Sequence, residues 1–456
     1  MKTFVRCGQL FTGQEDEAEE GGVLVFGEDG AIEYAGAAAA APRRGRQDRA
    51  LDYSQSFVMP GLIDVHTHLA YGNAKTEEDI DLYAPLEFRA LRGLFFAQKM
   101  LAAGFTALCS PGDSGQVSLA VRDAIEAGLF DGPRIMAAGP YLTTHQGLTD
   151  WYPTWIGAPD TSIGKLVANA GEAVQEVRRQ AKNGVDCVKI ALDGIARRDD
   201  GTLVAAFTQE ETDIITREIH RQGKKAVAHA RGREATLYAA RAGIDLIFHA
   251  NHLDGECIKA MLKNGCAVCP TMTQPRNVID FTQPFEPAYQ KRRPDFVERE
   301  YRIGVANWKK ARAAGVRLLT GTDTGFAVTP YGEWNARELE LFVADLGFTP
   351  AAALRAATEE NARFMTKGDR LGVLEKGRMA DFVALDGSPL ADIALLQNAY
   401  AIRAVYLAGR EIRIPERQYE PRKVSDFSLA NWTELYTRER VAELRRQRLP
   451  RAAAAE

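Results

Sequence analysis

The sequence of 456 residues predicts an α/β fold organised around a (β/α)8 barrel of the TIM type. Short apolar runs alternate with helical segments between residues 58 and 368, and eight such strand and helix units build this barrel. Polar side chains that can bind metal follow several of the apolar runs, and both ends of the chain show β-hairpin patterns instead. A doubly wound open sheet would show the same alternation, but the GxGxxG nucleotide motif is absent after the first strand.

The N-terminal element, residues 1–57, contains alternating apolar runs punctuated by Gly and Asp-Gly, as in GGVLVFGEDGAIEYAG. This pattern predicts β-hairpins. It returns in residues 369–415, as in GRMADFVALDG and AIRAVYLAGREIRI. The two pieces could be separate terminal domains, or one small sheet assembled from both ends. Residues 416–456 form a C-terminal extension with helical character.

The central element, residues 58–368, supplies the eight predicted barrel strands. In order they are GLIDVH, FTALCSP, PRIMAAGP, CVKIALD, KAVAHA, LIFHAN, AVCPTM and VRLLTGTD. Helical segments such as REATLYAARAG separate most of them and end at Gly, which easily adopts the left-handed conformation of a helix C-cap. Such a barrel gathers its catalytic groups at the C-terminal ends of the strands.

Composition narrows the classes of partner. Hydrophobic residues make up 46% and charged residues 26% of the chain, and the net charge is −4. These values are near the average of soluble proteins and favour neither nucleic acid nor an anionic membrane as a partner. No signal peptide and no apolar run of about 18 residues is visible. We therefore expect a cytoplasmic enzyme with a small-molecule substrate.

Six ionisable residues coincide with the ends of predicted strands one, four, five, six and eight. Taken singly, each has an ordinary explanation: a histidine can be hydrogen-bonded in a sheet, an aspartate can cap a helix, and a lysine can extend to water. In a barrel, however, all six would point at one axis, where burial without a cation would be costly. The donor types suit zinc, with cobalt, manganese or iron as substitutes. The six residues are His66, His68, Lys189, His229, His249 and Asp323.

At these residues the sequence resembles the metal-dependent amidohydrolase superfamily. PGLIDVHTH is similar to its first-strand signature, and the later ligand candidates follow in the same order. The ends of the chain resemble the small β-sandwich that these enzymes build from both termini. The resemblance implies two divalent ions, one on His66, His68 and Asp323 and the other on His229 and His249. It further implies that Lys189 bridges them as a carbamate formed with carbon dioxide, and that Asp323 moves the proton of the attacking hydroxide.

Within that superfamily the segments GFTALCSPGDS, HARGREAT, FHANHLDGE and GTDTG resemble the branch of imidazolonepropionases and Xaa-Pro or Xaa-Arg dipeptidases, some of whose relatives hydrolyse ureas and carbamates. The segment HARGREA lacks, in register, the glutamate that ring deaminases carry after the fifth-strand histidine. We therefore expect hydrolysis of an amide, peptide, urea or carbamate bond by a metal-bridging hydroxide. The alternatives are a ring deaminase, a cyclic-amide hydrolase or a non-catalytic barrel scaffold. Barrels of this type often associate, which predicts a homo-oligomer.

Four residues are candidates for substrate binding. His145 lies in GPYLTTHQGLTDWYP, in the place of a Gly-Gly-His-Gly loop whose glycines are missing here, and it could instead pack that loop. Tyr152 belongs to an aromatic loop that either lines an apolar pocket or packs on the barrel. Arg231 and His252 follow strands that carry ligand candidates and could bind an anionic substrate end or form salt bridges at the rim.

Overall fold

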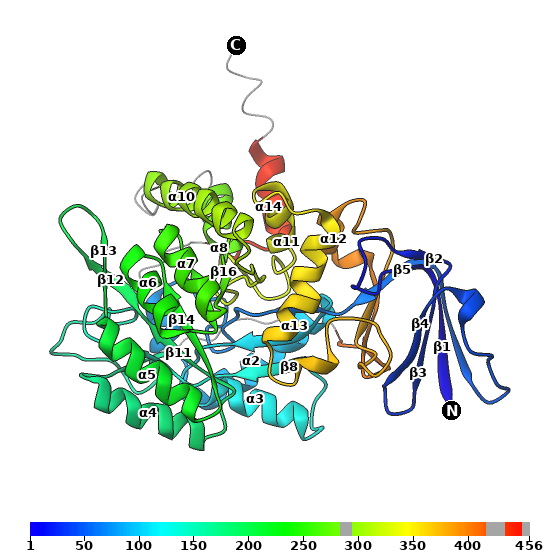
Figure 1. Cartoon of the computed structure of the whole chain (residues 1–456), viewed down its shortest axis with the longest axis horizontal. Helices are drawn as coiled ribbons and strands as arrows, with labels where there is room; N and C mark the ends of the chain where they lie inside the picture. Colours follow the sequence, from blue (N-terminus) through cyan, green and yellow to red (C-terminus); the bar gives the residue numbers. More distant parts are fainter. Residues whose placement is uncertain (283–293, 416–433, 449–456) are drawn as a thin grey trace, which may run out of the picture.

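Strands from both ends of the chain share one sheet, which stands beside the central β/α region in the computed structural model (Figure 1). The structure describes residues 1–282, 294–415 and 434–448. The order in the sheet is β19-β18-β17-β5-β1-β3-β4, with β2 beside β1. Their bounds are β1 (Lys2–Leu10), β2 (Glu19–Glu20), β3 (Val23–Gly27), β4 (Ile32–Gly36), β5 (Arg49–Pro60), β17 (Phe382–Leu385), β18 (Ile402–Leu407) and β19 (Arg410–Ile412).

Strand β5 joins the two ends of the chain. It pairs in parallel with β1 and antiparallel with β17, so one ladder on each side links residues far apart in sequence. Val5, Leu24 and Phe382 from the two ends pack in one buried cluster. Of the two arrangements left open by the sequence, the single shared sheet is therefore the one observed. A two-layer sandwich and the domain limits after residues 57, 368 and 415 stay predictions.

The central region contains parallel strands at the predicted places. Two sheets are formed, β6-β7-β8 and β10-β9-β11-β14-β15-β16, and a hairpin of β12 and β13 follows β11. Their bounds are β6 (Leu62–Asp64), β7 (Phe105–Ser110), β8 (Arg134–Ala137), β9 (Tyr141–Thr143), β10 (Gly164–Leu166), β11 (Cys187–Ala191), β12 (Asp193–Arg197), β13 (Leu203–Ala205), β14 (Lys225–Ala230), β15 (Leu246–His249) and β16 (Ala267–Cys269).

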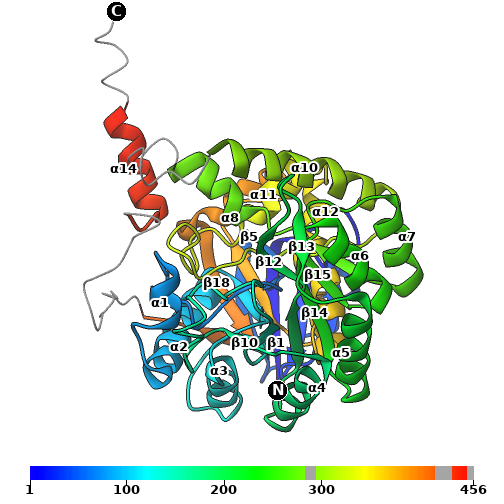
Figure 2. The same ribbon diagram turned by 90° about the vertical axis from the view of Figure 1, so that its left-hand side faces the viewer.

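Helices surround these strands, as Figure 2 shows for α4 to α7 around β14 and β15. Helix α6 ends at Gly243, whose φ angle of 78° is the left-handed cap predicted from the sequence. Helix α7 ends in the same way at Gly265, with a φ angle of 71°. The helices are α1 (Glu77–Asp81), α2 (Leu86–Ala102), α3 (Val117–Glu126), α4 (Ala170–Lys182), α5 (Gln209–Arg221), α6 (Arg233–Ala242), α7 (Gly255–Asn264), α8 (Thr273–Asn277), α10 (Pro294–Ala313), α11 (Arg337–Ala344), α12 (Pro350–Arg355), α13 (Asn361–Phe364) and α14 (Arg438–Arg448).

The eighth predicted strand, residues 316–323, is not a regular strand, and the assigned strands do not form one continuous closed sheet. This segment still bonds to both neighbours, because Leu319 N–H donates to Val268 O and Val65 N–H donates to Thr320 O. It then turns toward β6 at Gly321, where an added Cβ would lie 2.7 Å from that of His66. The close approach explains both the glycine and the loss of regular strand geometry.

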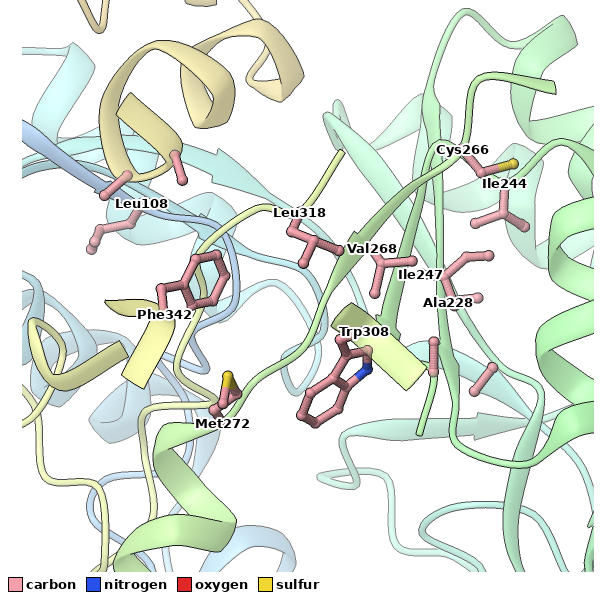
Figure 3. Packing of buried hydrophobic residues seen from close by; sticks show 14 of the residues in the cluster. Leu108, Ala228, Ile244, Ile247, Cys266, Val268, Met272, Trp308, Leu318 and Phe342 are labelled. Atoms are coloured by element: carbon pink, nitrogen blue, oxygen red, sulfur yellow. The ribbon is translucent and has the colours of Figure 1, made fainter. Parts of the chain in front are cut away.

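Alternation of side chains divides the core into two layers. Between strands and helices, Trp308 of α10 packs with Val268, Ile247 and Met272, as Figure 3 shows. On the opposite side of the same strands, residues from β6, β7, β8, β11, β14, β15, β16 and the segment 316–323 form a second cluster, which includes Leu319. A common interior shared by these strands is typical of a TIM-barrel-type α/β fold.

The C-terminal extension is described only in part. Helix α14 covers residues 438–448 of the predicted extension, and Trp334 Nε1 donates to Tyr436 O at 2.6 Å. The rest of the predicted extension, 416–433 and 449–456, lies outside the described residues. Within the described ranges no helix is both long and apolar enough to cross a bilayer. Oligomeric state and cellular compartment stay predictions.

One buried carboxylate on the helical layer gives a stability prediction. Glu218 of α5 accepts hydrogen bonds from Arg221 at 2.6 Å and from Arg178 of α4 at 2.8 Å. These bonds lower the pKa of Glu218 below its ordinary value of 4.5, so they stabilise the fold above that pH and are lost as the pH falls below it. Glu218→Gln should therefore reduce the free energy of unfolding by about 1–3 kcal/mol at pH 7. Urea denaturation should show a smaller difference at pH 4, and an unchanged difference would contradict the assignment.

Candidate metal centre and substrate cavity

A cavity of about 310 Å³ lies at the C-terminal ends of the central strands. Reactive groups of a (β/α)8 barrel are expected at this end of the strands. Its wall contains the side chains predicted from strands one, four, five, six and eight, with His66 behind them at 1% exposure. The predicted residues that line the cavity directly are His68, Lys189, His229, His249 and Asp323.

Asp323 and the two histidines of β6 lie close together. Asp323 Oδ1 is 3.2 Å from His68 Nε2 and 3.6 Å from His66 Nε2. Three ligand atoms, one from each of His66, His249 and Asp323, lie within 4.8 Å of one another. A metal ion can bridge atoms at this separation. Lys189 Nζ lies 3.2 Å from His66 Nε2, so the lysine reaches the same point.

Hydrogen bonds fix the ring of each β6 histidine. His68 Nδ1 donates to Gly112 O at 2.5 Å. His66 Nδ1 lies 3.1 Å from Thr271 Oγ1, whose own hydroxyl donates to Cys269 O, so the threonine accepts from the imidazole. Both rings are therefore anchored through Nδ1 and direct Nε2 toward the other ligand candidates, as in many histidine metal ligands.

The histidines of β14 and β15 are held by different contacts. His229 Nε2 lies 3.3 Å from Asp193 Oδ1, which leaves Nδ1 of that ring for a cation. The rings of His229 and His249 are 4.6 Å apart, and the carbonyl of His249 accepts a 2.6 Å bond from the indole of Trp308. The buried Asp193 carboxylate also accepts the backbone N–H groups of Arg231 and Gly232. These contacts orient both imidazoles toward the other ligand candidates.

Burial controls protonation in the site. It lowers the pKa of His66, His229 and His249, so these imidazoles are neutral at pH 7. Burial also lowers the pKa of Lys189 to about 8, against an attraction to Asp323 that acts in the opposite direction. For Asp323, burial would raise the pKa, but contact with His68 and the charge of Lys189 lower it overall. Neutral imidazoles, an ionised carboxylate and an accessible free amine are the protonation states that cation binding requires.

Backbone strain marks the ends of three neighbouring segments. His249, Thr271 and Asp323 have φ angles of 73°, 57° and 55°, in the left-handed region that residues other than glycine rarely adopt. Each such conformation costs about 1 kcal/mol or more and persists where the surrounding structure imposes it. Here it turns two ligand candidates and the partner of His66 toward the cavity.

The four predicted substrate-binding residues are not all at the cavity. Arg231 lines it. His252 Nε2 instead lies 2.8 Å from Oε2 of Glu300, which does line the cavity. The His145 side chain is 67% exposed, and its Nδ1 lies 3.4 Å from Asp150 Oδ2. Tyr152 does not line the cavity, whereas its neighbour Trp151 does. The roles of all four residues stay predictions.

Asp193 and Thr271 contact ligand candidates and were not predicted from the sequence. Asp193 is the aspartate of CVKIALDG, and a carboxylate just after the strand that bears Lys189 was a usable signal. Thr271 offered no such signal, because a threonine after a strand is common and its partner, His66, is 205 residues away. Only the tertiary structure brings the two together.

The barrel-type fold and the cluster of imidazoles, lysine and carboxylate at one end of it define an enzyme with a candidate metal centre. The sequence profile of the Amidohydrolase family matches residues 57–412. The chain therefore belongs to the amidohydrolase family and is an enzyme that acts on carbon–nitrogen bonds.

Known proteins agree with this membership. Ochratoxinase of Aspergillus niger is 28% identical over 435 residues, which span 91% of this chain and 87% of that protein. Imidazolonepropionase of Aromatoleum aromaticum is 25% identical over 370 residues, 77% of this chain and 82% of that protein. The crystal structure of a Xaa-Pro dipeptidase with bound methionine superposes with a TM-score of 0.78 and 27% identity, covering 90% of this chain and all of that one. The resemblance to the branch of imidazolonepropionases and dipeptidases is thus confirmed.

Proposed function

We propose that this protein is a metal-dependent hydrolase that cleaves the C–N bond of an amide, peptide, urea or carbamate. The observation that carries the proposal is the convergence of four histidines, Lys189 and Asp323 on one cavity. They come from strand ends up to about 260 residues apart, and their ligand atoms face one another. A set of neutral imidazoles and one carboxylate has the chemistry of a zinc site, which cobalt, manganese or iron could also occupy.

We propose that these donors serve two divalent ions. His66, His68 and Asp323 would hold one, and His229 with His249 the other. Lys189, whose Nζ lies 3.2 Å from His66 Nε2, would bridge them as a carbamate, formed when its free amine adds to carbon dioxide; its burial favours that free amine. When bound, the ions would supply Lewis acidity, which lowers the pKa of a water molecule and polarises the substrate carbonyl.

Asp323 is the residue placed to move protons. Its carboxylate lies at the cavity wall and is ionised at neutral pH, so it can accept the proton of the attacking water. The same group would then return that proton to the leaving nitrogen. The surrounding tyrosines Tyr71 and Tyr141 are buried against His68 and Lys189 respectively, and they limit the access of bulk water to this transfer.

A ring deaminase is the runner-up and is not favoured by the geometry. Glu234, the acidic residue nearest to the expected proton-shuttle position, bonds to Arg198 at 3.1 Å and to Tyr238 at 3.2 Å. It does not line the cavity, and its partner Arg198 belongs to the hairpin of β12 and β13. Deamination would require a proton shuttle that points into the cavity.

The cavity wall contains both apolar and charged side chains, which supports a substrate with both characters. Its apolar side chains include Ile80, Trp151 and Phe326. Arg231 also lines the cavity and, among the described residues, forms no ion pair. We propose that Arg231 binds a carboxylate of the substrate while the apolar side chains receive an acyl group.

The test of the function is hydrolysis by protein loaded with zinc or cobalt. The panel contains N-acyl amino acids, dipeptides, aryl ureas and carbamates, each compared with the chelator-treated protein. We expect release of an amine from at least one class, with activity restored by adding metal back. A folded protein that binds no metal and hydrolyses none of these bonds would refute the proposal.

Replacing Arg231 by methionine tests the carboxylate contact. Because a hydrogen bond to a charged group contributes about 1.5–3 kcal/mol, KM for N-acyl amino acids should rise by roughly 10- to 100-fold. The corresponding amino-acid amides, which lack the carboxylate, should be affected little. Arg198→Met is the matched control, since that arginine pairs with Glu234 outside the cavity. An equal loss on acids and amides would contradict the assignment.

A further inference from the structure

The short turn before α11 contains a buried asparagine that contacts two distant segments at once. Asn335 is 1% exposed. Its Nδ2 group lies 2.8 Å from Asp64 Oδ2 and 2.9 Å from Thr324 Oγ1, and it is 3.1 Å from Thr322 Oγ1. Hydrogen bonds from this amide therefore link the end of β6 to the turn after residues 316–321, two segments that lie far apart in the sequence.

These contacts surround two ligand candidates. Asp64 Oδ1 accepts the backbone N–H of His66 at 3.0 Å, and its Oδ2 accepts the hydroxyl of Thr322 at 2.7 Å. Thr322 and Thr324 flank Asp323, and their hydroxyls lie 2.6 Å apart. Since Asp323 has a left-handed φ of 55°, its direction depends on such neighbouring contacts more than on local backbone preference.

Glu338, three residues after Asn335, is a buried carboxylate that binds the loop containing Thr271, the hydrogen-bond partner of His66. Glu338 is fully buried and accepts the backbone N–H groups of Met272 and Thr273 at 2.9 and 2.8 Å. It also accepts the hydroxyl of Thr273 at 2.6 Å. These bonds hold the loop after β16, where Thr271 adopts a φ of 57° and contacts His66 Nδ1.

We infer that Asn335 and Glu338 are positioning residues for the ion held by His66, His68 and Asp323, an inference that rests on the metal centre proposed above. Asn335 sets the separation of His66 from Asp323, and Glu338 sets the ring orientation of His66 through Thr271. The other ligand pair is held independently, His229 by Asp193 and the His249 carbonyl by Trp308. Weakening the turn should therefore release one ion and leave the other bound.

Asn335→Asp is the most direct test. The substitution keeps the shape of the side chain but replaces the Nδ2 donor by a carboxylate oxygen, which repels the carboxylate of Asp64. The measurement is the number of Co²⁺ ions bound per chain after equilibrium dialysis, together with the visible Co²⁺ absorption spectrum. We expect about two ions for the wild type and about one for the variant at the same Co²⁺ concentration. Partners that orient metal ligands typically change affinity by about 10- to 100-fold. Glu338→Gln should shift the stoichiometry in the same direction.

Asn361→Asp is the matched control. Asn361 is also fully buried and also joins β6 to the segment 316–321, through Ile63 O at 2.7 Å and Thr320 O at 2.9 Å, but it contacts no ligand candidate. It should lower the melting temperature and still bind two ions. If both asparagine variants lose the same number of ions in proportion to their loss of stability, the role of Asn335 is structural and the inference is wrong.

The pair Thr322→Ser and Thr322→Val keeps the test decisive if Asn335→Asp does not fold. Serine retains the hydroxyl bonded to Asp64, whereas valine keeps the shape and removes it. We expect two ions for serine and one for valine. A folded valine variant with two ions and the wild-type spectrum would overturn the inference. Failure of the wild type to bind Co²⁺ would instead overturn the proposed function on which it rests.

Discussion

Replacing Lys189 by alanine is expected to remove both bound metal and hydrolytic activity. The Lys189 amine lies 3.2 Å from His66 Nε2 in a buried site, and it is the one residue proposed to contact both ions. Loss of a residue that only orients a ligand already costs about 10- to 100-fold in metal affinity or activity, so loss of the bridge should cost more than about 100-fold. Metal analysis of the purified variant and hydrolysis of the preferred substrate measure the effect.

Rescue separates the carbamate from a simple structural lysine. Acetate or propionate should partly restore activity to Lys189→Ala, because a short carboxylate can occupy the space of the carbamate and supply two oxygen ligands. Lys225→Ala is the matched control: this lysine stands at the opposite end of the neighbouring strand and pairs with Asp245 at 3.2 Å. Wild-type metal content and activity in Lys189→Ala would refute the two-ion assignment.

The second large effect is expected for Asp323→Asn. The amide keeps an oxygen where the carboxylate now faces His66 and His68, but it cannot accept a proton from the attacking water. Because general acid–base catalysis contributes about 10²- to 10⁴-fold, kcat should fall within this range while much of the metal is retained. The variant should also lose the acidic limb of the dependence of kcat on pH that ionisation of Asp323 produces.

Metal content decides how this result is read. Asp323→Asn with metal retained and kcat reduced supports a proton-transfer role, whereas unchanged kcat with metal retained contradicts it. Asp245→Asn serves as the control, because this aspartate lies before β15, at the end of the strand remote from His249, and contacts His220 and Lys225 instead. It should lower stability slightly and leave kcat unchanged.

Much of the site could be predicted from the sequence, because the C-terminal ends of all barrel strands lie at the same end of the barrel. His229 and His249 were predicted to meet because each ends an apolar run, and the rings are indeed 4.6 Å apart. The same logic worked for Asp323 even though its segment is not a regular strand, since the backbone there still bonds to both neighbouring segments. It worked less well for His145 and His252, which lie in loops whose paths no periodicity specifies.

Periodicity, capping glycines and local motifs are properties of neighbouring residues, so the alternation of strands and helices, the six ligand candidates and the family could be predicted from the sequence. The sequence left open whether the terminal strands share a sheet, and it could not reveal the contacts of Asn335 and Glu338 beside the candidate metal centre. Asn335 is 271 residues from Asp64, and Glu338 is 66 residues from Met272. Such contacts depend on how distant segments pack in three dimensions, which local sequence patterns do not specify.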